Sequence, residues 1–241
     1  MQNYLYKDLY QLEGEHWWHL AKREIVIKLL KQYVRAKKPR IVDLGCGTGK
    51  NLEALSALGS TFGIDSSPRA ISFCRKRGIS RVSCARAEKT GLPSASVDVV
   101  TLLDVLEHTE DHQVLAELAR ILKDGGLVVI TVPSYPWLWS RWDEVLEHKR
   151  RYTLAVLSSS LTAVGFRILQ SSYLYSFLVM PVSILRLVKS TVFTRAYPSD
   201  FRLSSPFMNR LMLKLCQLEQ AVRRCVRIPF GTTLIFIAQK P

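Results

Sequence analysis

The feature that most constrains the fold is a glycine-rich turn between an apolar run and a helix-forming segment. The sequence predicts a short buried strand at 40–44, the turn Gly-Cys-Gly-Thr-Gly at 45–49, and a helix from Lys50 to about Leu58. Because glycine has no Cβ and tolerates positive φ, such a turn lets the backbone approach a ligand closely. Asp65 ends the next predicted strand, 20 residues after the first glycine, where a carboxylate can accept both hydroxyls of a ribose. The pattern predicts a nucleoside-cofactor site, and its alternative is a tight turn beside a surface aspartate.

Strands and helices alternate after this turn. Further strands are expected at 61–65, 81–84, 97–103 and 126–132, with helices at 68–77 and 112–122 between them, and then a helix at 154–164 and strands at 166–169 and 232–238. A succession of βα units folds into a parallel sheet because each crossover returns the chain in the same direction. We therefore expect an α/β fold with a Rossmann-like, doubly wound, mostly parallel sheet and helices on both faces.

Three regions follow from this pattern. Residues 1–38 form an N-terminal helical cap, in which 15–34 have the three- and four-residue apolar spacing of an amphipathic helix. The core comprises 39–170 and 230–241. Residues 171–229 form a helical, basic, partly apolar insertion before the last strand, far longer than an ordinary connection.

Charge and cysteine usage limit the partners and the compartment. The formal net charge of +14 predicts attraction to a polyanion: nucleic acid, an anionic membrane or a phosphorylated substrate. Five cysteines without a CxxC pair predict neither a disulfide framework nor a zinc cage, so no metal site is expected. The N-terminus has no apolar core of signal-peptide length. We expect a cytoplasmic protein.

The segment Asp43-Leu44-Gly45-Cys46-Gly47-Thr48-Gly49 resembles motif I of the class I S-adenosylmethionine-dependent methyltransferases rather than a dinucleotide fingerprint. Ile64-Asp65, the segment 97–108 and the segment 122–127 are also similar to that family, so the resemblance extends over about 40–133. In detail the chain is similar to the ubiquinone-biosynthesis branch (methyltransferase types 11, 12 and 23), including the triplet Leu106-Glu107-His108.

The resemblance implies S-adenosylmethionine as cofactor and a role for each matching residue. By this resemblance, the glycines of the turn, Gly45, Gly47 and Gly49, border the methionine part of the cofactor, and Asp43 helps to hold its amino group. Asp65 binds the ribose, and Ala87 and Glu88 flank the adenine. Asp104 begins the loop beneath the sulfonium. One position departs from the family. Arg86 stands where relatives commonly have an aspartate that accepts the adenine amino group, which puts adenine recognition partly in question.

A catalytic base is expected in the loop after the fifth strand, where the acceptor sits in this fold. In methyl transfer the protein mainly aligns the acceptor and excludes water, but a hydroxyl acceptor also loses a proton. An imidazole has a suitable pKa, and His148 lies in this loop. A structural or surface histidine is the alternative, and His16 and His108 are weaker candidates for the base. Tryptophans in the cap and the loop could wall the acceptor pocket or could simply pack in the core or an interface.

The insertion combines apolar and basic character. Residues 173–188 are almost entirely apolar but too short and broken to span a membrane. Apolar residues then repeat at helical spacing from Phe207 to Val226, and 186–227 contain nine basic and two acidic residues. Such an element suits an anionic membrane face that supplies a lipid-like acceptor. A helical cap over the acceptor site and a homodimer interface are the alternatives.

The sequence therefore favours an S-adenosylmethionine-dependent methyltransferase that methylates an oxygen of a small or lipid-like acceptor, cytoplasmic and peripheral on the inner face of the membrane. RNA methylation is an alternative suggested by charge. Residues 132–135 (Val-Pro-Ser-Tyr) lack the Asp/Asn-Pro-Pro-aromatic motif of exocyclic-amine methylation, and no RNA-binding module is recognised, which argues against nucleic acid. A noncatalytic, membrane-associated protein that binds S-adenosylmethionine is a third reading, suggested by Arg86.

Overall fold

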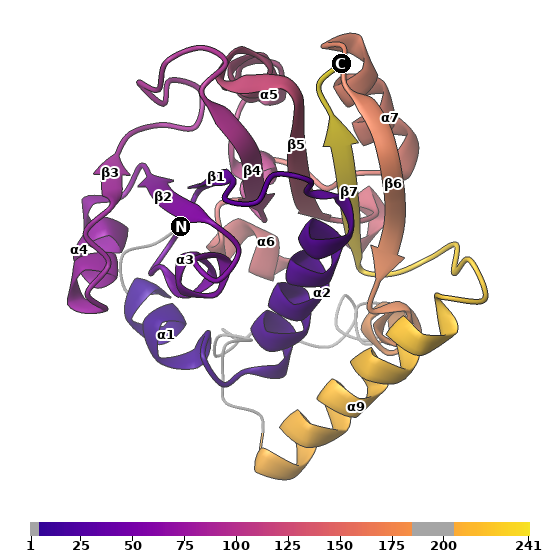
Figure 1. Ribbon diagram of the computed structural model, residues 1–241. Coiled ribbons are helices and arrows are strands. Elements are labelled where there is room, and N and C mark those ends of the chain that lie inside the picture. Colours follow the sequence, from indigo (N-terminus) through magenta and orange to yellow (C-terminus); the bar gives the residue numbers. More distant parts are fainter. Residues whose placement is uncertain (1–4, 185–204) are drawn as a thin grey trace.

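The computed structural model describes residues 5–184 and 205–241, which contain a seven-stranded sheet with helices on both faces (Figure 1). The strand order is β3-β2-β1-β4-β5-β7-β6. Neighbours from β3 to β5 pair in parallel, whereas β7 runs antiparallel between β5 and β6. The predicted Rossmann-like, mostly parallel sheet is confirmed. The strands are β1 (Arg40–Leu44), β2 (Ser60–Asp65), β3 (Val82–Cys84), β4 (Val97–Leu103), β5 (Leu122–Pro133), β6 (Arg167–Leu174) and β7 (Thr233–Gln239).

Alternating side chains of the central strands build two separate cores, because successive residues of a strand point to opposite faces of the sheet. In β1, Val42 packs on the face that carries α5 and α7, and Ile41 packs on the face that carries α2 and α9. The helices are α1 (Leu5–Leu12), α2 (Trp17–Tyr33), α3 (Lys50–Leu55), α4 (Pro68–Lys76), α5 (Asp111–Ile121), α6 (Arg141–Val145), α7 (Leu154–Ala163) and α9 (Pro206–Val222), with 3-10 turns η1 (Leu106–His108), η2 (Pro136–Leu138) and η3 (Ser176–Leu178).

Several elements differ from the sequence-based expectation. The helix after the glycine turn ends at Leu55, short of Leu58, and α1 lies within the predicted helical cap 1–38 but was not expected as a separate helix. Strand β6 continues to Leu174, so it includes the first four residues of the predicted insertion. Its last residues lie opposite β7, where Tyr173 pairs with Leu234. The sequence missed this extension because the strand is only half-buried and contains polar residues. The domain boundaries drawn from the sequence stay predictions.

Within the insertion, α9 packs along α2 (Figure 1). Asn209 fixes this arrangement, because its side-chain oxygen accepts the Trp17 backbone N–H at 2.7 Å and its amide donates to the Glu15 carbonyl at 2.9 Å. Part of the apolar stretch 173–188 and four of the basic residues counted above lie outside the described residues (Arg186, Lys189, Arg195 and Arg202). In the described part of the chain, no helix has the length and apolar character needed to cross a membrane.

Candidate cofactor and acceptor site

The glycine turn between β1 and α3 has the backbone conformation that its sequence predicts. Gly45 and Gly47 both have positive φ, at 72° and 54°. A Cβ on Gly45 would lie 2.2 Å from a methyl carbon of Val105, so the loop after β4 packs directly against the turn. At Gly47 a Cβ would meet only Leu9, at 3.5 Å. Glycine at position 45 is therefore required by the contact with Val105, whereas a Cβ at Gly47 would make only an ordinary van der Waals contact, with Leu9 of α1.

Asp43 lies beneath the turn with an unsatisfied acceptor. Its side chain is 1% exposed, and its Oδ1 accepts the Thr101 hydroxyl at 2.6 Å, but its Oδ2 has no hydrogen-bond partner. Burial raises the pKa of Asp43 to about 7. An unpaired buried acceptor costs about 1–3 kcal/mol, and an ammonium donor would offset that cost. The orphaned oxygen therefore fits the role that the resemblance implies for Asp43, to hold the amino group of S-adenosylmethionine.

Asp65 connects the turn to the start of α4. Its Oδ2 accepts the Gly47 backbone N–H and its Oδ1 accepts the Ser67 backbone N–H, both at 2.9 Å. Burial raises the pKa of Asp65 in spite of these two donors. Each carboxylate oxygen can accept a second bond, so the side chain is held in place while it retains capacity for two ribose hydroxyls.

The predicted adenine residues lie next to Asp65. The Ala85 backbone N–H donates to the Asp65 carbonyl at 3.1 Å, and the chain then forms a narrow turn in which Arg86 pairs with Lys89. Ala87 packs at the margin of the core. Arg86, the departure from the family pattern, is 74% exposed and its guanidinium lies 3.4 Å from Glu88, whose side chain is 11% exposed. Glu88 therefore already has a cationic neighbour.

Helix α1 covers the glycine turn, and sequence reasoning, which placed these residues in a helical cap, missed it as a separate helix. The Glu13 carboxylate accepts the Thr48 hydroxyl and the Arg77 guanidinium, the latter at 2.7 Å. Tyr6 is buried, and its burial, with the nearby Asp65 carboxylate, raises its pKa to about 12. The signal was present in the sequence as the spacing of Leu5, Leu9 and Leu12. It was overlooked because the segment is short and rich in tyrosine.

Asp104 follows β4 and faces α2. It has a strained φ of 56°, and its Oδ1 accepts the Thr131 hydroxyl at 2.8 Å. Its Oδ2 pairs with the ammonium of Lys22, a lysine that is only 5% exposed. Burial raises the pKa of Asp104, but Lys22 outweighs that effect and keeps the pKa below its ordinary value. The contact joins residues 82 positions apart, so no local pattern pointed to Lys22.

His148 lies between α6 and α7, where its orientation is fixed by Asp143. Nδ1 of His148 is 2.9 Å from Oδ1 of Asp143, which is fully buried. The same carboxylate accepts two bonds from Arg151, at 2.7 and 3.0 Å. Burial raises the pKa of Asp143, but the bonds from His148 and Arg151 outweigh it and hold the pKa well below its usual range. An ionised Asp143 favours the tautomer with the proton on Nδ1, which leaves the lone pair of His148 on Nε2.

Glu107 and His108, from η1, complete the surroundings of His148. The Glu107 side chain is 0% exposed, and neither of its carboxylate oxygens receives a hydrogen bond from another residue. Oε1 of Glu107 lies 3.9 Å from Nε2 of His148, and the His108 ring packs edge-on against the His148 ring at 4.8 Å between centroids. Burial raises the pKa of Glu107 well above its ordinary value. The site thus contains a buried acid beside two imidazoles.

Other candidates from the sequence have structural partners. His16 caps α2 by accepting the Trp18 backbone N–H at 3.3 Å. Trp17 packs in the core against Tyr175, and Trp137 is 61% exposed. The basic run after His148 is ion-paired: Lys149 to Glu110 at 2.5 Å, Arg150 to Asp111 at 3.1 Å, and Arg151 to Asp143.

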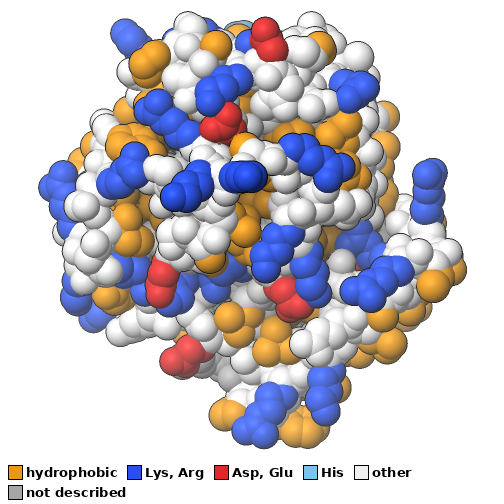
Figure 2. Space-filling view, in the orientation of Figure 1, with side chains coloured by type: hydrophobic (Ala, Val, Ile, Leu, Met, Phe, Trp, Pro, Cys, Tyr) orange, Lys and Arg blue, Asp and Glu red, His pale blue; other side chains and the backbone are white. Residues whose placement is uncertain are grey.

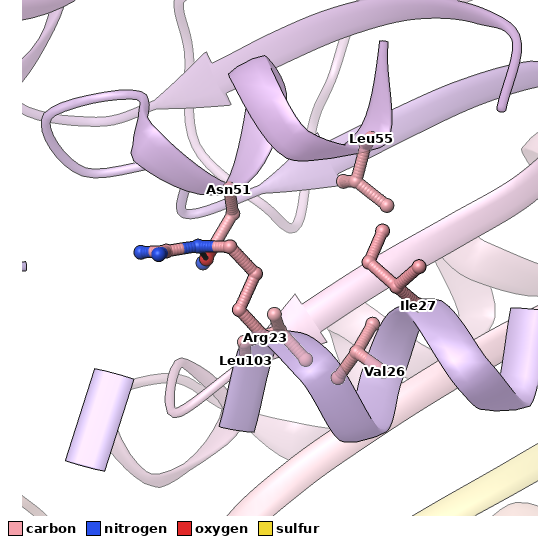
Figure 3. Close-up of a pocket in the computed structure, with 6 residues that line it drawn as sticks. All are labelled: Arg23, Val26, Ile27, Asn51, Leu55 and Leu103. Carbon is pink, nitrogen blue, oxygen red and sulfur yellow. Dashed lines mark hydrogen bonds between the residues drawn. The ribbon is translucent and has the colours of Figure 1, made fainter. Parts of the chain in front are cut away.

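A small cavity lies between α2, α3 and the end of β4 (Figure 3). Its apolar wall comes from Val26, Ile27, Leu55 and Leu103, and it is too narrow to hold a water molecule. Arg23 donates to Asn51 at 3.2 Å across its polar side. Pockets that hold small-molecule ligands usually measure about 300–1,000 Å³. This cavity is therefore too small for a nucleoside cofactor in the present conformation.

Comparisons with known proteins agree with the geometry. Residues 42–130 match the family model described as "Methyltransferase domain". The chain is 28% identical over 163 residues to a probable S-adenosylmethionine-dependent methyltransferase of Mycolicibacterium smegmatis, covering 65% of this chain and 62% of that protein. It is 32% identical over 104 residues to a ubiquinone biosynthesis O-methyltransferase of Xanthomonas oryzae pv. oryzae, covering 38% of this chain and 42% of that one.

A solved structure shows the same fold. The S-adenosylmethionine-dependent methyltransferase from Archaeoglobus fulgidus superimposes with a TM-score of 0.59 and 21% identity, covering 90% of this chain and 94% of that chain. The chain spans less than two thirds of the length of the first curated relatives, at 62% and 57%. The matched segment contains the glycine turn, Asp65 and Asp104, the residues that the resemblance assigned to the cofactor. Over residues 42–130 the chain is thus similar to the S-adenosylmethionine-dependent methyltransferases.

Proposed function

We propose that this protein transfers the methyl group of S-adenosylmethionine to a hydroxyl oxygen of a small or lipid-like acceptor, at an anionic membrane surface. One observation supports oxygen as the methylated atom: the buried His148–Asp143 pair in the loop after β5. His148 lies close enough to Asp104 for the charge of its imidazole to act on the Asp104 carboxylate. Methylation of a hydroxyl needs a proton acceptor, and an imidazole oriented by a carboxylate is suited to that role.

The cofactor, when bound, supplies a methyl group activated on a sulfonium. The protein's residues bind the cofactor, accept the proton of the acceptor hydroxyl and exclude water. Asp43 holds the amino group and Asp65 holds the ribose hydroxyls. Nε2 of His148 accepts the proton that leaves the acceptor hydroxyl, and the Asp143 carboxylate stabilises the imidazolium that forms. Helix α1, tied to the turn through Glu13 and Thr48, excludes water from the reacting atoms.

The membrane part of the proposal is supported by the outer face of α9. Phe207, Leu211, Leu218 and Val222 fall on one stripe at helical spacing and are between 39% and 75% exposed. The exposed Lys214 and Arg210 flank the stripe. Figure 2 shows hydrophobic and basic side chains interspersed along the part of the surface that α9 forms. An apolar stripe with basic flanks suits a helix that lies in the plane of an anionic interface.

The alternative is that the apolar stripe of α9 binds a second copy of the chain. In that case nothing ties the protein to a membrane, and a water-soluble acceptor is equally compatible with the site. The two readings predict different behaviour in solution. A dimer interface makes the mass observed by analytical ultracentrifugation depend on protein concentration without any lipid.

The acceptor class can be tested in cells. We expect mass spectrometry of lipid and metabolite extracts, with and without the protein, to show a pair of compounds that differ by one methyl group. A pair found only in the aqueous extract would contradict a lipid-like acceptor but would still support methyltransferase activity. The absence of any such pair would favour a noncatalytic protein that binds S-adenosylmethionine.

A further inference from the structure

We propose that exposed aromatic and apolar side chains at one edge of the sheet form a second membrane contact, which places the acceptor site against the bilayer. Four side chains of this surface, here called the aromatic edge, are between 37% and 61% exposed: Trp137, Trp139, Val226 and Phe230. The tryptophans follow β5, and the other two lie in the segment that joins α9 to β7. A group of exposed apolar side chains marks a binding surface more reliably than a single one does. The inference rests on the proposed function, in which α9 is the first contact.

The sheet topology brings the two segments of the aromatic edge together. Strand β7 is antiparallel to both of its neighbours, and its first residue, Thr233, pairs with the last residue of β5, Pro133, and with the last residue of β6, Leu174. The strands β5 and β6 therefore end where β7 begins, and α9 lies beside this edge (Figure 1). The Ser134 hydroxyl donates to the Gly231 carbonyl. The loop after β5 and the segment before β7 are thus fixed to each other.

The aromatic loop is preformed by its packing on β6. The rings of Tyr135 and Tyr173 stack with centroids 5.5 Å apart and 13° between their planes, and the Trp137 ring lies 5.5 Å from that of Tyr135. Trp137 thus belongs to an ordered group of rings and is nevertheless 61% exposed. Tryptophan and tyrosine are enriched at the boundary between lipid headgroups and acyl chains, because each combines an apolar ring with a polar atom. The loop therefore fits a membrane boundary.

The charge of the segment before β7 favours an anionic bilayer as the partner. Residues 220–241 contain four basic residues and no acidic residue. Arg224 and Arg227 are exposed and alternate along the chain with Val226 and Phe230. Basic side chains interleaved with apolar ones bind anionic headgroups while the apolar side chains enter the acyl boundary. A second copy of this chain would bring the same positive charge to the surface, which opposes self-association there.

The aromatic edge is connected to the proposed acceptor site by a short series of hydrogen bonds. The Arg151 guanidinium donates to the Ser134 carbonyl at 3.2 Å and to the Asp143 carboxylate, which in turn orients His148. A bilayer that covers the aromatic edge therefore lies next to the acceptor site. This placement defines the acceptor class as a membrane lipid whose reactive hydroxyl lies at headgroup depth, because such a hydroxyl reaches His148 without crossing bulk water.

Quenching of tryptophan fluorescence by brominated lipid tests the contact. The full-length protein is mixed with vesicles of phosphatidylglycerol and phosphatidylcholine in equal amounts, and in one set the phosphatidylcholine carries bromine on its acyl chains. We expect brominated vesicles to quench the wild type, and most of this quenching to be lost in a variant with Trp137→Phe and Trp139→Phe. Trp17→Phe, at a buried tryptophan, is the matched control and should keep the quenching. Vesicle-bound wild type with equal fluorescence in both sets would overturn the aromatic edge and leave α9 as the membrane contact.

A variant with Trp137→Ser and Trp139→Ser separates this inference from the proposed function. Methyl transfer to a lipid extract is measured with the extract in the same vesicles and, separately, in detergent micelles. We expect the variant, with wild-type circular dichroism, to lose about tenfold or more in vesicles, where the lost apolar area weakens docking, and to match the wild type in detergent.

Three other outcomes are decisive. An equal loss in detergent would make the tryptophans part of the acceptor pocket and overturn the membrane contact. A lipid-free dimer of the wild type that the serine variant does not form would assign the aromatic edge to a subunit interface and also overturn it. Quenching as expected, without methyl transfer by the wild type in vesicles or detergent, would support the membrane contact and contradict the proposed function.

Discussion

His148 and Asp143 are joined at 2.9 Å, and the two are also linked through the backbone, because the His148 N–H donates to the Asp143 carbonyl at 2.8 Å. Arg151 donates twice to the same carboxylate. The imidazole is therefore held by a fully buried ionised group in a loop that otherwise contains little regular structure. This arrangement makes His148 a better candidate for chemistry than His16, which is used to cap a helix.

Replacement of His148 tests its role in proton removal. We expect His148→Ala to lower the methyl-transfer rate by about a hundredfold or more, because the hydroxyl of the acceptor loses its base. Cofactor affinity should stay nearly unchanged. Single-turnover kinetics at several pH values measure the first effect and calorimetry measures the second. An active variant with the wild-type pH profile would eliminate the base role, and His112→Ala serves as the exposed control.

Asp65 should control cofactor affinity. Its carboxylate is oriented by two backbone N–H groups, so its loss removes a preformed acceptor for the ribose hydroxyls. We expect Asp65→Ala to weaken S-adenosylmethionine binding by about 1 to 3 kcal/mol. Asp124→Ala, at a side chain that is 84% exposed, is the control. Calorimetry that gives equal affinity for folded Asp65→Ala and wild type would falsify the assignment.

Asp43 should make the cofactor-free protein lose stability as the pH rises. Its folded pKa of about 7 lies above the ordinary value of 3.8, so the folded state binds the extra proton between these values. By linkage, this contribution to the free energy of unfolding is present near pH 4 and decreases as the pH rises to about 7. Asn at this position mimics the protonated carboxyl.

We therefore expect Asp43→Asn to be more stable than wild type at pH 8 by more than about 1 kcal/mol, with a difference that shrinks toward pH 4. The same variant should bind S-adenosylmethionine more weakly, because the amide has no charge for the amino group. Urea unfolding at several pH values checks the first statement. A stability difference that does not change with pH would contradict the raised pKa.

The membrane surface can be tested on basic residues of α9 and of the turn that follows it. Arg223 and Arg224 are adjacent in the sequence, but Arg223 is half-buried beside Glu219, whose charge acts on it. Lys214 and Arg224 are the exposed pair. We expect Lys214→Gln with Arg224→Gln to reduce co-sedimentation with anionic vesicles, and binding of the wild type to weaken as salt rises.

Apolar contacts should contribute separately from charge. Phe207→Ser with Leu218→Ser should lower binding to anionic vesicles at high salt as well as at low salt, because the inserted apolar area is lost. Neutral vesicles are the control. If the wild-type protein does not bind anionic vesicles at low salt, the proposed membrane-binding surface is contradicted. The apolar stripe of α9 would then be assigned to a subunit interface or an acceptor cap.

The sequence located the side chains that lie together at the predicted cofactor site more completely than those at the predicted acceptor site. Asp43 and Asp65 could be found because a strand, a turn and a fixed spacing are local features, and the sheet places both beside the turn. His148 was predicted from its place after β5, but its partner Asp143 was not, because the path of an irregular loop is not encoded in any periodicity. The Lys22–Asp104 pair and the complete burial of Glu107 depend on tertiary packing between distant segments.

The most direct test of the central claim is transfer of radiolabel from methyl-labelled S-adenosylmethionine to a lipid extract by the purified protein. The account predicts that wild-type protein moves label into an organic-soluble product, and that His148→Ala binds the cofactor but moves about a hundredfold less. Wild-type protein that binds S-adenosylmethionine tightly and transfers no label to any lipid or aqueous acceptor fraction would contradict it.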